Sequence, residues 1–164
     1  MSEPIVVYGF ETSNNMKVRV ALGYKGLSYS FQTINPGDRA EILRLSGQYL
    51  TPVLVHGENV TFDSSAILRY LDVHFESTPK LYGGSVQEQW AIEDWELFGR
   101  KVLADPMMAV VHTKISGGVV SDELKSRCQD EFHAAVEHIV LHMEGREWLV
   151  GGHWLTASLK RSRT

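Results

Sequence analysis

A junction between a strand and a helix is encoded in the stretch Thr61-Phe62-Asp63-Ser64-Ser65-Ala66-Ile67-Leu68-Arg69-Tyr70-Leu71. Its first residues are β-branched or aromatic, which favours a strand. Asp63 and the two serines after it have side chains that cap helix N-termini. Ile67, Leu68 and Leu71 then recur at helical spacing. The stretch predicts a strand that ends at residue 62 and a helix that follows at once.

The residues on the N-terminal side of this junction alternate between strand-like and helical patterns. Residues 5–8 form a β-branched run that predicts a short buried strand closed by Gly9. A helix is expected to start near Met16 and to stop at Gly26, where a residue without a Cβ suits the left-handed position after a helix. Residues 29–34 alternate again and predict a second strand.

A turn, a short helix and a hairpin fill the interval up to the junction. Residues 35–38 have the composition of a turn, and residues 40–45 carry the spacing of a short amphipathic helix. Residues 52–55 and 60–62 predict two strands around a hairpin turn at 56–59. The resulting order, βαβ followed by α and ββα, gives a parallel pair of strands extended by antiparallel ones. This is the thioredoxin topology.

The second half of the chain carries helical spacing only. Residues 76–84 contain one proline and two adjacent glycines and are expected to link the halves. The sequence therefore predicts an α/β domain at residues 1–76 and an all-helical domain at residues 85–164. Pro106 removes a backbone donor, so it is expected to kink or restart the first long helix of the second domain.

Composition narrows the class of protein. The chain has 164 residues, of which 43% are hydrophobic and 22% charged, with a formal net charge of −4 and one cysteine, Cys128. These values are typical of a globular chain, and they offer no basic field for nucleic acid outside the short tail at residues 160–164. No apolar run is long enough to cross a membrane. The lone cysteine and the absence of a visible leader favour a cytoplasmic location.

Three stretches of the sequence resemble the cytosolic glutathione transferases, and the resemblance is to the bacterial type of this family. One is the junction described above, which is similar to the family's Glu/Asp-Ser-x-Ala-Ile-x-x-Tyr-Leu signature. The others are Tyr8-Gly9-Phe10-Glu11-Thr12-Ser13-Asn14-Asn15-Met16-Lys17-Val18-Arg19 and Ser46-Gly47-Gln48-Tyr49-Leu50-Thr51-Pro52-Val53-Leu54. The resemblance covers almost the whole chain. It implies a thioredoxin-like domain followed by a helical domain, with glutathione as co-substrate and no metal.

The turn after the first strand is the expected catalytic element. A thiol with a pKa near 8.5 is only a few per cent thiolate at neutral pH, and the thiolate is the nucleophile. A hydroxyl and unpaired helix N–H groups favour the anion. The resemblance implies this role for Thr12, Ser13 or the Asn14 amide. Counting from the Lys-Val-Arg start of the helix favours Thr12, whereas counting from Gly9 favours Ser13, and simple helix capping is the alternative.

Two further segments are expected to hold glutathione. A cis peptide bond between Thr51 and Pro52 would present the backbone of Thr51 to an extended peptide, as an added strand does. Asp63 would meet the γ-glutamyl ammonium group, and the Ser64 hydroxyl with the helix N-terminus would meet its carboxylate. Without the resemblance, helix capping explains these two residues equally well.

The sequence departs from the family pattern in this region. Leu50 stands two residues before the proline, where the family often carries Lys, Arg or Gln for the glycine end of glutathione. Arg39, Arg44 or Gln48 are the candidates to replace it, and spacing does not choose among them. The turn has no cysteine, which argues against thiol exchange of the glutaredoxin or omega type, and it lacks the Ser-Ser-Cys of the zeta type.

The end of the chain departs as well. Residues 148–158 resemble the family's Leu-x-Gly-x-x-x-Thr-x-Ala-Asp passage, with Leu159 in place of the Asp, and no apolar helix follows. We therefore expect a shortened helical domain, an incomplete pocket for the electrophile and a homodimer or larger oligomer that covers apolar surface. The residues expected on that surface are Trp90, Trp95, Met107, Met108 and Trp154.

The remaining candidate sites have plainer explanations. His138 and His142 stand four residues apart, a spacing able to hold a metal, but solvated helical histidines explain the pair and no metal site is predicted. Cys128 is expected to be a small packed or half-exposed residue of a helix.

Two functions follow. The first is a glutathione transferase that joins the thiolate to small electrophiles. The second is a catalytically silent module of the same fold that serves dimerisation or protein binding.

Overall fold

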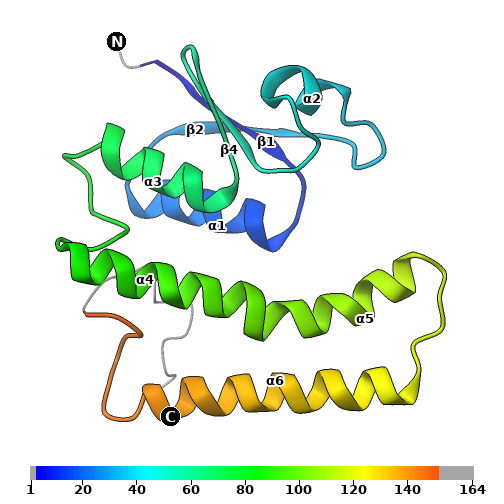
Figure 1. Cartoon of the computed structure of the whole chain (residues 1–164). Helices are drawn as coiled ribbons and strands as arrows, with labels where there is room; N and C mark the ends of the chain where they lie inside the picture. The colour runs from blue at the N-terminus through cyan, green and yellow to red at the C-terminus, as the bar shows by residue number, and fades with distance from the viewer. Residues whose placement is uncertain (1–2, 152–164) are drawn as a thin grey trace. The chain divides into compact units, whose positions relative to one another are not determined.

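A computed structural model describes residues 3–151 (Figure 1). The chain divides into two compact units with the boundary between Leu81 and Tyr82. This boundary falls inside residues 76–84, the stretch with the composition of a linker.

The first unit alternates strands and helices in the predicted order. Its elements are β1 (Ile5–Gly9), α1 (Ser13–Tyr24), β2 (Tyr29–Thr33), α2 (Ala40–Ser46), β3 (Val53–His56), β4 (Asn59–Phe62) and α3 (Ser64–His74). The start of α1 near Met16 was predicted wrongly, because the helix begins at Ser13. Its first turn is polar and carries no apolar residue from which the helical period could be recognised.

The four strands form one sheet in the order β2-β1-β3-β4. β1 pairs parallel with β2 and antiparallel with β3, and β3 pairs antiparallel with β4. The predicted thioredoxin topology is therefore confirmed. Tyr8 lies opposite Val53, and Val53 lies opposite Phe62. The end of β1, the start of β3 and the end of β4 consequently meet at one edge of the sheet.

Helices cover both faces of this sheet. Successive side chains of a strand point to opposite faces, so Val7 and its partner Leu54 share one face while Tyr8 and Val53 share the other. Val53 packs in a cluster with Ile34 and Ile42, which places α2 on its face. α1 and α3 contact each other on the opposite side, as Figure 1 shows.

A buried ion pair fastens the end of the first unit. The side chain of Lys25, just after α1, is fully buried, and its Nζ lies 2.7 Å from Asp72 Oδ1 in α3. Lys25 Nζ also donates to the carbonyl oxygen of Pro79 at 3.0 Å, and the backbone N–H of Leu81 donates to Asp72 at 2.8 Å. Residues 79–81 are thus held against the helices by groups that no sequence pattern had singled out.

Helices are the only regular elements among the described residues of the second unit, as predicted. It contains α4 (Val86–Phe98), the π-helical segment η1 (Gly99–Ala104), α5 (Asp105–Ile115) and α6 (Asp122–His142). Ser85 and Glu88 form a capping box at the start of α4. Pro106 is the second residue of α5, which follows η1 without a break, so the helix changes from π to α type beside the proline and does not stop and restart. Among the described residues no helix is long and apolar enough to cross a membrane.

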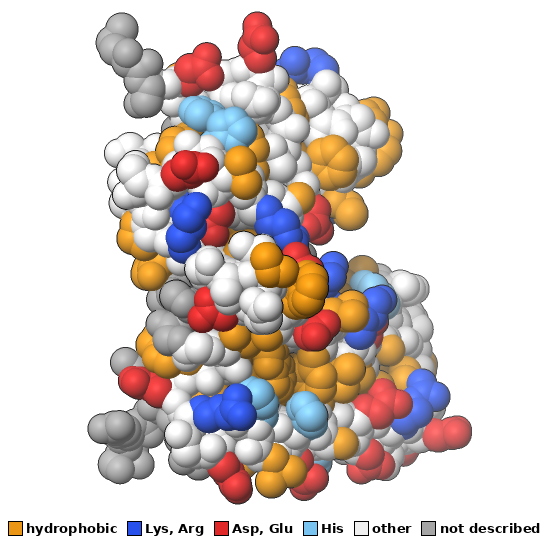
Figure 2. All heavy atoms as spheres, turned by 60° about the vertical axis from the view of Figure 1, so that its left-hand side comes forward, with side chains coloured by type: hydrophobic (Ala, Val, Ile, Leu, Met, Phe, Trp, Pro, Cys, Tyr) orange, Lys and Arg blue, Asp and Glu red, His pale blue; other side chains and the backbone are white. Residues whose placement is uncertain are grey.

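Several apolar side chains of the second unit lie on its surface. Trp90 is 63% exposed, and Met107 and Met108 are exposed as expected. Trp95 is half-buried instead, because its ring packs against Phe98. Trp154 lies outside the described residues, as does most of the passage at residues 148–158. Figure 2 shows hydrophobic side chains gathered on these helices, with histidines beside them.

We predict that Lys25→Met destabilises the protein by about 3 kcal/mol, because it keeps the aliphatic volume and leaves the Asp72 carboxylate without its buried cation. The exposed pair Lys125 and Asp122, with N···O at 2.8 Å, provides a control, since Lys125→Met should cost less than about 1 kcal/mol. Urea unfolding of the two variants measures the difference. Equal small losses in both would show that the buried pair contributes nothing special.

Candidate functional site

The three segments predicted to bind glutathione leave the sheet at the same edge. β1 ends at Gly9 before the turn that contains Thr12, β3 begins after Pro52, and β4 ends just before Asp63. The register that pairs Tyr8, Val53 and Phe62 brings these three points side by side. This arrangement follows from the strand order.

The predicted catalytic residues occupy the start of α1. Thr12 is the N-cap residue of α1 and has an extended backbone. Within the described residues, its side chain accepts no hydrogen bond from the backbone of α1. Ser13 and Asn14 are the first two residues of the helix, and all three side chains are exposed. The alternative in which the Thr12 hydroxyl serves as a helix cap is therefore wrong. Because α1 begins at Ser13, Ser13 and Asn14 lie inside the helix instead of before it.

A residue that the sequence did not single out joins two of the candidate segments. Asn15 is only 1% exposed, and its Nδ2 donates to Thr12 Oγ1 at 2.7 Å and to Thr51 Oγ1 at 3.0 Å. Thr12 and Thr51 are thus held by the same carboxamide. No spacing rule identifies such a link, because it depends on how β1 and β3 are paired.

Gly9 leaves the space that Asn15 occupies. A Cβ built on Gly9 would lie 1.7 Å from Asn15 Oδ1, far inside van der Waals contact. Asn15 Oδ1 is itself buried and accepts no hydrogen bond among the described residues. The glycine that closes the first strand in the sequence pattern therefore has a second role, which is to admit the carboxamide.

Residues of the turn before α1 are contacted by a side chain of α1 and by a side chain of the loop before α2. Glu11 Oε1 lies 2.9 Å from Arg19 Nη1 in α1. A hydrogen bond with Tyr29 and the negative charge of Glu11 raise the pKa of the Arg19 guanidinium above its usual value. On the other side, the Arg39 guanidinium carbon lies 5.1 Å from the centre of the Phe10 ring. The position of Thr12 is thus defined by its neighbours as well as by Asn15.

The segment before β3 has the conformation expected from the resemblance. The peptide bond between Thr51 and Pro52 is cis, and Pro52 is buried. Leu50 is 73% exposed and has an apolar side chain. The Gln48 side chain is bound to Ser46 Oγ at 2.8 Å and to both backbone groups of Leu50, so its amide is engaged within this turn.

Two arginines near this segment differ in their contacts. Arg39 Nη1 donates to the carbonyl oxygen of Tyr49 at 3.0 Å, which holds the guanidinium beside the chain that leads to Pro52. Arg44 lies 3.8 Å from Glu41 on α2 and is exposed. The candidates were Arg39, Arg44 and Gln48. Of these, only Arg39 both contacts this segment and carries a positive charge that no carboxylate pairs in the described residues.

Asp63 and Ser64 stand at the start of α3. Asp63 Oδ1 accepts hydrogen bonds from the N–H groups of Ser65 at 2.9 Å and Ala66 at 3.1 Å, so this carboxylate caps the helix. Its backbone has a φ of 68°, the only positive value at a residue other than glycine in the described part of the chain. Such a conformation is uncommon outside glycine and is enriched at functional sites. Ser64 is buried beside it.

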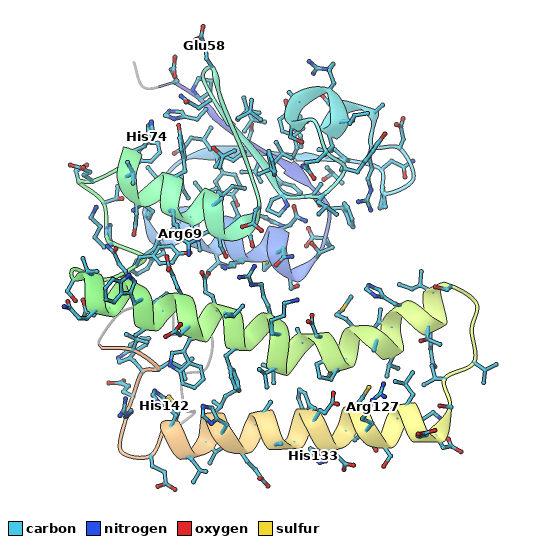
Figure 3. All side chains as sticks on the ribbon, in the orientation of Figure 1. Glu58, Arg69, His74, Arg127, His133 and His142 are labelled. Carbon is cyan, nitrogen blue, oxygen red and sulfur yellow. The ribbon has the colours of Figure 1, made fainter. Side chains whose placement is uncertain are left out.

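Other groups of reactive side chains lie on α6, along which Figure 3 labels Arg127, His133 and His142. The rings of His138 and His142 pack against Trp95 at 5.7 and 4.5 Å between centroids, so the pair is explained by aromatic contacts. Cys128 is buried, which is the first of its two expected states. It borders an open cavity of about 320 Å³ between α5 and α6, lined mainly by apolar side chains. No group of three metal-ligating side chains occurs within residues 3–151.

Comparison with known proteins gives one consistent result. Residues 7–79 match the family model of the glutathione S-transferase N-terminal domain. A zeta-class glutathione S-transferase of Euphorbia esula is 29% identical over 134 residues, which cover 70% of this chain and 60% of that protein. Glutathione S-transferase 1 of Dianthus caryophyllus is 35% identical over 85 residues, or 49% of this chain and 38% of that protein. The matched part of the chain thus spans less than two thirds of the length of these relatives.

The fold similarity extends further along the chain than the family model. The crystal structure of a rice glutathione S-transferase in complex with glutathione superposes with a TM-score of 0.81 at 20% identity. The superposition covers 96% of this chain and 73% of that one. It therefore includes helices of the second unit.

We predict that Asp63→Ala lowers the free energy of unfolding by about 1–2 kcal/mol, because α3 loses its side-chain cap and alanine tolerates a positive φ poorly. Asp63→Asn keeps the capping oxygen and should stay within about 0.5 kcal/mol of the original protein. Thermal unfolding followed by circular dichroism measures both variants. Equal stability of the two would contradict the capping role.

Proposed function

The chain belongs to the glutathione transferase family, whose N-terminal domain it contains at residues 7–79, and from this premise we propose that it joins the thiolate of glutathione to small electrophilic substrates. The observation that carries the proposal is the meeting of Thr12, Thr51 and Asp63 at one edge of the sheet. We also propose that the protein is a homodimer and is located in the cytoplasm. The binding of glutathione is described for the rice structure, and it is proposed for this chain.

Thr12 is the proposed partner of the glutathione sulfur. Its hydroxyl oxygen accepts a hydrogen bond from Asn15, so its own hydrogen is left to donate elsewhere. A hydroxyl that donates to the sulfur stabilises the thiolate and lowers the pKa of the thiol. The N–H groups at the start of α1 add a favourable field for the same charge. Among the described residues no comparable contact orients the Ser13 hydroxyl, and this supports Thr12 over Ser13 and Asn14.

The backbone of Thr51 is the proposed partner of the central residue of glutathione. The ladder between β1 and β3 begins with Tyr8 opposite Val53, so Thr51 and Pro52 lie just outside it. In the described residues the N–H and C=O of Thr51 take part in no backbone hydrogen bond outside the strands. Such groups at the end of a strand are suited to bind an extended peptide.

The start of α3 is the proposed site for the γ-glutamyl group. Asp63 uses one carboxylate oxygen to cap the helix, and the other is available to the γ-glutamyl ammonium. The Ser64 hydroxyl and the α3 N-terminus favour the carboxylate of the same group. Capping and binding are compatible, because they use different oxygens of Asp63.

Arg39 is the proposed partner of the glycine carboxylate. Its link to Tyr49 places its positive charge beside the residues that precede Pro52. Gln48 is engaged with Leu50, and Arg44 lies beside Glu41. Among the three candidates, the contacts therefore favour Arg39.

The first test is retention of the full chain on immobilised glutathione, together with conjugation of a generic aryl halide. We expect both retention and turnover. Absence of both would favour the alternative function, a catalytically silent module used for dimerisation or protein binding. No particular feature of the described part of the chain supports that alternative.

The second test concerns the hydroxyl. Thr12→Ala removes a hydrogen bond to a charged sulfur, worth about 1.5–3 kcal/mol, so conjugation at neutral pH should fall roughly 10- to 100-fold. Because the pKa of the bound thiol rises, the pH–rate profile should move to higher pH and the rate should recover in alkali. Ser13→Ala is the matched control and should leave the profile in place. A shift with Ser13→Ala alone would assign the role to Ser13 and contradict the proposal.

A further inference from the structure

We propose that Asn15 is a positioning residue that directs the proton of the Thr12 hydroxyl toward the glutathione sulfur and couples this hydroxyl to Thr51. The inference rests on the proposed function and extends it to a residue that does not itself touch glutathione. It concerns the direction of one hydrogen bond.

The direction follows from the donors and acceptors present. A carboxamide nitrogen carries two hydrogens and no acceptor. Asn15 Nδ2 lies at 2.7 Å from one threonine oxygen and 3.0 Å from the other, so both hydrogens are used. The hydrogen of the Thr12 hydroxyl must then point away from Asn15. Within the described residues it meets no protein acceptor, and the Thr12 side chain is exposed.

The Asn15 side chain fills an enclosed space beside Gly9. The side chain is 1% exposed, and Oδ1 lies where Gly9 has no Cβ. This oxygen is buried without a hydrogen-bond partner among the described residues. An unsatisfied buried polar atom costs free energy, and such atoms in a native fold call for an explanation. The two donated hydrogen bonds supply one, because an apolar residue would fill the space but would leave both hydroxyls undirected.

The donated hydrogen bonds also affect the strength of the proposed contact. A hydroxyl whose oxygen accepts a hydrogen bond becomes a better donor, because linked hydrogen bonds polarise one another. The same carboxamide ties the sulfur partner to Thr51, beside the backbone that is proposed to hold the cysteinyl residue. Sulfur and peptide are therefore placed relative to each other by one side chain.

Asn15→Asp is the direct test, since it has almost the same shape and exchanges donors for acceptors. The Thr12 hydroxyl would then donate to the introduced carboxylate instead of the sulfur, so we expect the pKa of the bound thiol to rise by at least about one unit, a tenfold change in thiolate fraction. Ultraviolet titration of the thiolate in the complex measures this pKa. The value of kcat at neutral pH should fall at least tenfold, with a smaller change in KM for glutathione and recovery at high pH.

Asn59→Asp is the matched control, because it makes the same chemical change at an exposed residue of the hairpin. It should leave the pKa of the thiol unchanged. Asn15→Ala should raise the pKa by a smaller amount than Asn15→Asp, because it removes the donors without supplying a competing acceptor. An unchanged thiol pKa in both Asn15 variants would overturn the proposal.

A second measurement needs neither glutathione nor a variant at the buried site. The side-chain amide signal of Asn15 in a ¹⁵N-labelled protein should shift on Thr12→Val and again on Thr51→Val. Each change removes one oxygen that accepts from Asn15 Nδ2. If neither change moves the signal, the inference fails even where the protein binds glutathione. If the signal responds but the original protein does not bind glutathione, the proposed function fails and the catalytic role of Asn15 fails with it.

Discussion

The hydrogen bonds that Asn15 donates to Thr12 and Thr51 depend on the antiparallel pairing of β1 with β3, and the proposed site depends on both. The pairing places Tyr8 opposite Val53, so that the turn after β1 and the segment before β3 begin from neighbouring positions. Extension of the same row to Phe62 adds the start of α3. A change of register by one residue would separate these groups. It would also move the side chains of the shifted strand to the opposite face of the sheet.

At the edge of the sheet where Thr12, Thr51 and Asp63 meet, the same side chains are available for helix capping and for ligand binding. Asp63 caps α3 with one oxygen and keeps another for the proposed contact with an ammonium group. Thr12 stands at the N-cap of α1, yet its hydroxyl is held by Asn15 and is not used by the helix backbone. The first helix therefore begins without a side-chain cap from its N-cap residue. Its first N–H groups are the ones that the proposed thiolate would face.

Much of the fold could be predicted from the sequence, because the signals were local. The β-branched run at the start of the chain, the hairpin and the helix after Asp63 follow from short-range periodicity and turn composition. The start of α1 was missed because its first turn is polar. The pairing of Lys25 with Asp72 and of Asn15 with Thr51 could not be predicted. Each joins residues far apart in the chain, and a single lysine or asparagine has no period that marks it as buried.

The most direct measurement is a crystal structure of the full chain with glutathione bound. We expect the sulfur within hydrogen-bond distance of Thr12 Oγ1 and farther from the Ser13 hydroxyl. We also expect the cysteinyl backbone beside Thr51 and the γ-glutamyl group at the start of α3. A sulfur held by Ser13, or glutathione bound away from this edge of the sheet, would contradict it.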